Sequence, residues 1–153
     1  MKGTIFSLIL TTTFVSLLNI NKVLSEDCSH SEGIFRCVRF IDNYDGDTFT
    51  VNIPRVHHFF GKKVPIRIKG IDTPELKTID PCEKEQAIKA KKLTNDFLAK
   101  AGIIELRNTE RGKYFRVVAD VFVDGKSLAD ELIYKGLAVP YDGDTKPIVN
   151  WCR

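Results

Sequence analysis

The sequence lacks a hydrophobic run long enough to cross a membrane. Its uncharged, apolar stretch from Ile5 to Leu18 has 14 residues, whereas a membrane-spanning helix needs 18 or more. Lys2 precedes the stretch, and Val23 and Ser25 supply small residues at the −3 and −1 positions of a cleavage site, which is typical of a secretory signal peptide. A buried N-terminal helix is the less favoured alternative, because the stretch has no polar positions at helical spacing. We therefore expect residues 1–25 to be removed, leaving a secreted or periplasmic domain of residues 26–153 without stable membrane insertion.

A large net charge is also absent. The formal charge is +3, and loss of residues 1–25 would remove two lysines and no acids, leaving 21 basic against 20 acidic residues, or +1. This balance excludes a protein that coats nucleic acid through overall positive charge, so any such contact must be local. Residues 35–153 contain no low-complexity linker, so we expect one domain, and a monomer is the simplest assembly.

The cysteines do not follow a zinc-binding pattern. No C-x-x-C motif occurs, and the three histidines are not near the cysteines at ligand spacing. An even number of cysteines after a signal peptide is typical of disulfide bonds instead. Four cysteines allow three pairings, of which we favour Cys28 with Cys37 and Cys82 with Cys152.

The hydrophobic pattern predicts five strands and two helices. The expected strands are residues 38–44, 48–53, 64–69, 103–108 and 115–123, and the expected helices are residues 81–101 and 127–135. Residues 54–62 have no period and should form an exposed loop that includes His57, His58, Phe59 and Phe60. A helix between the third and fourth of five short strands favours an α+β, mainly β, fold built on a five-stranded OB-type Greek-key barrel. Periodicity alone leaves an open α+β sheet nearly as favoured.

Two acidic turns carry the candidate chemistry. One contains Asp45 and Asp47, and the other contains Asp72, Thr73 and Glu75. Carboxylate and carbonyl oxygens of this kind are the ligands that calcium prefers. An Asp-Gly-Asp segment is more often a plain turn, and the pentapeptide Tyr-Asp-Gly-Asp-Thr indeed recurs at residues 141–145, where we interpret it as a turn.

Two arginines distinguish the first Tyr-Asp-Gly-Asp-Thr copy, at residues 44–48, from the second. Arg67 precedes Asp72 on a predicted strand, and Arg116 stands at the start of another. Acids, arginines and a cation together are what phosphodiester hydrolysis requires, because the guanidinium fork binds phosphate and never loses its proton.

Four segments, DGDTFTV (45–51), VPIRIKGIDTPE (64–75), KYFRVVADVFVDGK (113–126) and LADELIYKGLA (128–138), resemble the staphylococcal nuclease family. They occur in that family's order and at similar separations, over about residues 37–140. The resemblance implies an OB barrel with helices, hydrolysis of DNA and RNA to 3′-phosphate ends, and calcium as the cofactor.

The resemblance also implies roles for individual residues. Asp47 and Asp72 would bind calcium through carboxylates and Thr73 through its carbonyl. Glu75 would activate or position water, and Arg67 and Arg116 would hold the scissile phosphate. Tyr114 would lie beside the nucleotide, and Asp45 would be a nearby supporting acid.

Two features depart from the family pattern. Phe115 stands where the family often has glycine, and the chain after residue 140 is too short for the long third helix of the best-known members. The alternative to an enzyme is an OB module that binds nucleic acid without cutting it. We favour the enzyme because the acids and arginines are all present.

Overall fold

The computed structural model describes residues 28–152, so the expected signal peptide lies outside the described residues. Two disulfides are present in this part of the chain, and they join Cys28 to Cys37 and Cys82 to Cys152, the pairing that we favoured. No helix between residues 28 and 152 is both long enough and apolar enough to cross a membrane.

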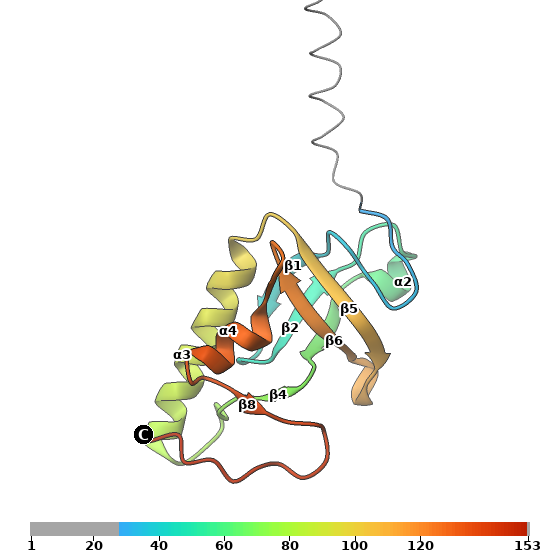
Figure 1. The fold of residues 1–153 in the computed structure, drawn as a ribbon. Coiled ribbons are helices and arrows are strands. Elements are labelled where there is room, and N and C mark those ends of the chain that lie inside the picture. The colour runs from blue at the N-terminus through green and yellow to red at the C-terminus, as the bar shows by residue number, and fades with distance from the viewer. Residues whose placement is uncertain (1–27, 153) are drawn as a thin grey trace, which may run out of the picture.

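The secondary structure is an α+β arrangement dominated by short strands (Figure 1). The elements in chain order are β1 (Arg39–Asn43), β2 (Thr48–Asn52), α2 (His58–Gly61), β3 (Val64–Ile68), β4 (Ile71–Asp72), α3 (Pro81–Ala99), β5 (Ile104–Arg111), a 3-10 turn (Lys113–Phe115), β6 (Val117–Val123), β7 (Lys126–Ser127), α4 (Leu128–Tyr134) and β8 (Val139–Pro140). The five predicted strands and two predicted helices are therefore present, with ends that differ by a few residues.

The main sheet curls into an OB-type barrel. Its strands follow the order β1-β2-β3-β6-β5, with β3 and β6 parallel. The segment before β1 reaches back to β5, where Phe35 and Leu106 exchange backbone hydrogen bonds of 2.9 and 2.8 Å. Alternating strand residues such as Phe49, Val51 and Ile66 are fully buried inside. The alternating strand residues thus form the core of the barrel, and the polar turns lie at the rim of the barrel.

Helix α3 forms where its sequence signals predict. The Asp80 carboxylate accepts hydrogen bonds from the N–H groups of Cys82 and Glu83, and Pro81 occupies the first turn, where its missing N–H costs nothing. Ala87 and Ala90 are fully buried, and small side chains on that face let the helix lie close to the turn between β1 and β2.

Three features differ from the predicted elements. The segment predicted as a loop contains the short helix α2, and residues 115–116 belong to a 3-10 turn and its cap instead of a strand. Strands β4 and β8 pair with each other in a small second sheet. Each of these elements has four residues or fewer, which is too short to give a periodic signal.

Candidate functional site

The turn between β1 and β2 is held by the Asp45 side chain. Its Oδ1 accepts hydrogen bonds from the N–H of Asp47 at 3.1 Å and of Thr48 at 2.7 Å, as in an Asx turn. Gly46 lies against α3, because an added Cβ would stand 2.7 Å from the Cβ of Ala90. This close approach directs Asp47 into the molecule, where its exposure is only 3%.

Asp47 is joined to the second acidic segment by Thr73. The carboxylate Oδ2 of Asp47 accepts hydrogen bonds from the Thr73 N–H at 3.2 Å and from the Thr73 hydroxyl at 2.9 Å. Asp72 and Thr73 are themselves 5% and 3% exposed. The two acidic turns, 25 residues apart in sequence, therefore meet at one buried point.

Arg67 lies between the two buried carboxylates. Its Nη1 contacts Asp47, and its Nη2 donates to Asp72 Oδ1 at 3.3 Å and to the Ile71 carbonyl at 3.1 Å. The register of the sheet explains this position, since Arg67 pairs with Thr48 across β2 and β3.

The bend after β3 brings the second acid to the same place. Gly70 has a φ of +78°, a left-handed conformation that glycine adopts without a steric penalty. Asp72 follows two residues later and is the carboxylate that shares Arg67. The bend at Gly70 thus places Asp72 where it meets Arg67.

Burial and charge shift the ionisation of this cluster. Burial lowers the pKa of Arg67, although the charges of Asp72 and Asp45 oppose that effect. Burial likewise raises the pKa of Asp45, against the Thr48 hydrogen bond and the charge of Arg67. The ionisation of the acids and of the arginine is therefore interdependent, and burial keeps these groups poorly hydrated. Shifted pKa values with such causes are common at functional sites.

Arg116 lies near the cluster, directly before β6, the strand that pairs with the strand of Arg67. Strands β3 and β6 are parallel, and Arg67 pairs with Val118, two residues after Arg116. The positive charge of Arg116 contributes to the lowered pKa of Arg67. The second arginine thus acts on the same region, as the sequence predicted.

Tyr114 and Phe115 stand out from the surface beside Arg116. They are 86% and 90% exposed, and both have left-handed backbones with φ near +60°. The Arg116 guanidinium lies 5.9 Å from the Tyr114 ring centroid, within cation–π range. Phe115 therefore fills no part of the described cluster, and its backbone has the conformation for which a glycine would be preferred.

Glu75 extends from the second acidic turn and is largely exposed. Its backbone N–H donates to Glu83 Oε1 at 3.0 Å, which attaches it to the start of α3. Its carboxylate contacts the ammonium of Lys146, which also lies 3.3 Å from Asp72 Oδ1.

Lys146 is the site residue that the sequence did not reveal. It comes directly after the second Tyr-Asp-Gly-Asp-Thr copy, which we interpreted as a plain turn. Burial opposes the charge of Lys146, but the hydrogen bond that its ammonium donates to Glu75 and the charge of Asp72 leave the pKa of Lys146 raised. Pairing of β4 with β8 brings this part of the chain back to Asp72, and no sequence signal marks such a short pairing.

The donors of the cluster suit a hard cation. Asp47 and Asp72 offer buried carboxylate oxygens, and Thr73 lies between them. No group of three or more His, Cys, Asp or Glu side chains in residues 28–152 is arranged to enclose a metal. A cation here would therefore keep several ligands from backbone oxygens, water or substrate, which calcium readily accepts with six to eight oxygen ligands.

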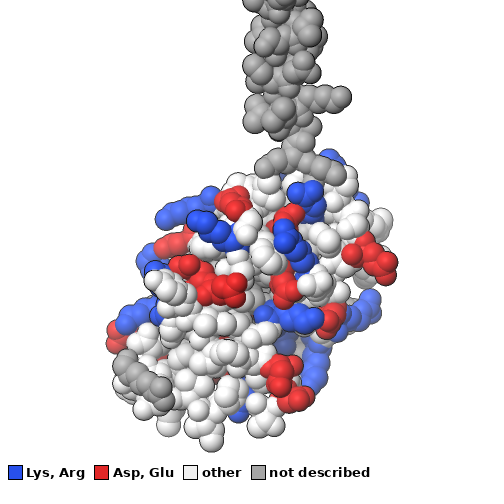
Figure 2. All heavy atoms as spheres, in the orientation of Figure 1, with Lys and Arg blue, Asp and Glu red and all other residues white. Residues whose placement is uncertain are grey.

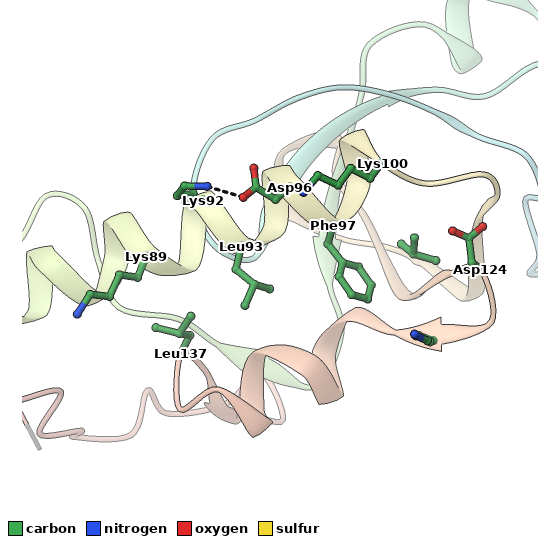
Figure 3. A pocket seen from close by; sticks show the side chains of 10 residues that line it. Lys89, Lys92, Leu93, Asp96, Phe97, Lys100, Asp124 and Leu137 are labelled. Carbon is green, nitrogen blue, oxygen red and sulfur yellow. Dashed lines mark hydrogen bonds and ion pairs between the residues drawn. The ribbon is translucent and has the colours of Figure 1, made fainter.

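Other hollows of the described surface lie away from these acids. One has a volume of about 550 Å³ and lies beside α3, with Leu93, Phe97 and Leu137 as apolar walls and Lys89 and Lys100 among the charged residues around it (Figure 3). It contains none of the predicted site residues. The carboxylate cluster itself lies at the rim of the barrel, in the turns that precede β2 and follow β3.

Comparison with known proteins identifies relatives of this chain. A family model described as "Staphylococcal nuclease homologue" matches residues 65–148. The chain is 36% identical over 110 residues to "Endonuclease YncB" of Bacillus subtilis (strain 168), covering 68% of this chain and 49% of that protein. It is also 36% identical over 110 residues to "SPbeta prophage-derived endonuclease YokF" of the same organism, covering 68% and 35%. The chain thus spans about half, or less, of the length of these relatives.

Proposed function

The chain belongs to the family of staphylococcal nuclease homologues, and on this premise we propose that it is a calcium-dependent nuclease that hydrolyses phosphodiester bonds of DNA and RNA. The observation that carries the proposal is the contact of Arg67 with both Asp47 and Asp72 at a buried point of the barrel rim. We further propose that the domain acts as a monomer after export, in the periplasm or outside the cell.

Arg67 can keep its contacts with Asp47 and Asp72 and still bind a phosphate. A guanidinium has five N–H donors in a planar fork, and the contacts to Asp47, Asp72 and Ile71 use three of them. The remaining donors, with those of Arg116, would stabilise the charge that develops on the phosphorus oxygens.

Glu75 is the residue best placed to act on water. It is more exposed than Asp47 and Asp72, and it lies in the same acidic segment. In the proposed reaction it orients a water or takes its proton, the water oxygen bonds to phosphorus, and the P–O5′ bond breaks. The products are a 3′-phosphate and a 5′-hydroxyl, whose oxygen takes up a proton as it leaves.

Asp47 and Asp72, with Thr73, would hold the calcium ion. When bound there, calcium would neutralise a phosphate oxygen and so favour attack at phosphorus. Asp45 supports this set indirectly, because its side chain fixes the turn that carries Asp47. Tyr114 stands beside Arg116, where its exposed ring can contact a nucleotide.

The proposal is tested by digestion of single-stranded DNA, double-stranded DNA and RNA with calcium, with magnesium and with a chelator. We expect cleavage with calcium, loss of cleavage with the chelator, and 3′-phosphate ends. Glu75→Gln should remove most turnover and leave oligonucleotide binding largely intact, since it removes a charge that acts on water and no phosphate contact. Binding without cleavage by the unaltered protein under every metal would overturn the proposal in favour of a non-catalytic OB module.

A further inference from the structure

Helix α2 presents two exposed phenylalanines that the proposed nuclease chemistry does not use. Phe59 and Phe60 are 76% and 67% exposed, and their rings meet edge to face with centroids 5.0 Å apart. Adjacent exposed aromatic rings form a continuous apolar patch, a feature found at interaction surfaces. We propose that residues 54–63, here called the α2 tip, form a docking surface for an anionic lipid bilayer.

The charge around the two rings fits an anionic surface. Arg55, Lys62 and Lys63 are exposed within the α2 tip, and residues 54–63 contain no acid. Basic residues beside apolar rings are the usual combination at the headgroup level of a membrane, where the rings enter the interface and the cations contact lipid phosphates.

Hydrogen bonds and close packing fix the α2 tip, which carries these rings. The Ile53 N–H donates to the Gly61 carbonyl at 2.7 Å, and a Cβ on Gly61 would stand 2.7 Å from the Ile53 carbonyl. The Lys63 N–H donates to the Asn52 side chain at 3.0 Å, and the His57 ring accepts from the Phe59 N–H at 3.3 Å. The rings are therefore held outward by a loop that is fixed to the end of β2.

The place of the α2 tip in the fold favours a membrane as its partner. A hydrogen bond of 2.6 Å joins His30 to the Pro54 carbonyl, so the chain leaves the described domain beside the tip (Figure 1). The uncharged stretch that ends at Leu18 lies only ten residues before Cys28, a span of at most about 36 Å. Residues 1–25 can hold a bilayer close to the tip only before their expected removal, so in the exported domain the rings and basic residues of the tip must bind the membrane by themselves.

Docking by the α2 tip would leave the carboxylate cluster accessible. Asp47 lies directly before β2, and the α2 tip follows the other end of the same strand. The length of this five-residue strand, about 16 Å, therefore separates Asp47 from the tip. Nucleic acid fits the tip less well, because single strands stack on ring faces, and the Phe59 and Phe60 rings are inclined by 84°.

A tryptophan reporter tests the proposal in the full chain. In a Trp151→Phe background, which removes the native tryptophan, Phe60→Trp places the reporter on the tip, and Ile88→Trp places the control on the exposed face of α3. Each is titrated with phosphatidylcholine vesicles, with and without phosphatidylglycerol, carrying lipids brominated in the acyl chains.

We expect a blue shift and strong quenching of the Phe60→Trp emission with the anionic vesicles, and neither for Ile88→Trp. Adding Lys62→Gln and Lys63→Gln should weaken the response by about 30-fold in lipid concentration, since each basic residue contributes about a factor of five. An unchanged Phe60→Trp emission would overturn the proposal. So would a response to single-stranded oligonucleotide alone, or to rising protein concentration alone, which would assign the tip to nucleic acid or to a second copy of the chain.

Discussion

Gly46 shows how one residue without a side chain positions a candidate metal ligand, Asp47. Its backbone lies against Ala90 of α3 and against Thr73, and a Cβ would stand 2.7 Å and 3.0 Å from their Cβ atoms. Neither neighbour is a flexible side-chain end, so a methyl group here must move the turn that carries Asp47. The identity of this residue therefore matters to the site although it has no functional group.

Gly46→Ala should destabilise the fold by about 1–3 kcal/mol, the usual cost of overpacking, and should also weaken calcium binding. Urea unfolding and calorimetric titration measure the two effects. Gly125→Ala is the matched control: its cost of about 1–2 kcal/mol comes from a left-handed backbone, with a φ of +80° and open space around the Cβ. Equal calcium affinities for the two variants would contradict the role of Gly46.

Lys146 places a second cation among the acids. Its ammonium contacts Asp72 and Glu75, and its side chain is 48% exposed. A divalent ion bound to Asp72 would share that carboxylate with the ammonium, so the two positive charges oppose each other.

Lys146→Met should therefore tighten calcium binding by roughly fivefold, equivalent to about 1 kcal/mol. Lys146→Arg, which keeps the charge, should bind calcium as the unaltered protein does. Calorimetric titration compares the three proteins without any need for turnover. Weaker calcium binding by Lys146→Met would show instead that the lysine supports the site.

At the scale of secondary-structure elements, the segment before β1 is attached to β5 by charge as well as by backbone pairing. Glu105 of β5 accepts from Arg36 and from Arg107, each at 2.5 Å, and its side chain is 12% exposed. The Arg107 hydrogen bond, assisted by Arg36 and opposed by burial, lowers the pKa of Glu105. A carboxylate with a lowered pKa in the folded state stabilises the fold above its ordinary value of 4.5 and loses that contribution as the pH falls through the folded value.

Glu105→Gln should consequently cost about 1 kcal/mol at pH 7, because both arginines lose their ionic partner. The difference from the unaltered protein should shrink as the pH falls below 4.5. Urea unfolding at pH 7, 4.5 and 3 measures it. A difference that stays constant with pH would mean that shape, and not charge, sets the contribution of Glu105.

Elements with long periodic patterns could be predicted from the sequence, and short ones could not. Helix α3 was marked by its apolar spacing, its Asp80 cap and Pro81, and the β1–β2 hairpin was marked by its turn. The pairing of β4 with β8 involves two residues on each strand, so no period exists to detect. The position of Lys146 depends on that pairing, which is why the sequence revealed the acids but not their second cation.

At the scale of the whole molecule, positively and negatively charged side chains are intermixed. Figure 2 shows Lys and Arg side chains interspersed with Asp and Glu over the visible face. Residues 26–153 have 21 basic and 20 acidic residues. A nucleic acid is therefore expected to be held by a few local contacts and not by a broad positive surface.

The salt dependence of oligonucleotide binding tests this expectation. Arg67 and Arg116 would contact phosphate in the proposed function, and Lys113, three residues before Arg116, is counted here as a third contact; each phosphate contact with a single strand contributes a slope of about −0.7 in log K against log salt. Glu75→Gln protein, which should bind without cutting, should thus show a slope of about −2 with single-stranded DNA at fixed calcium. Arg116→Gln in that background should bring the slope to about −1.4, because one counterion-releasing contact is lost. A slope of about −5 or steeper would require several more phosphate contacts than these three residues can make, and it would extend the nucleic-acid surface beyond the barrel rim.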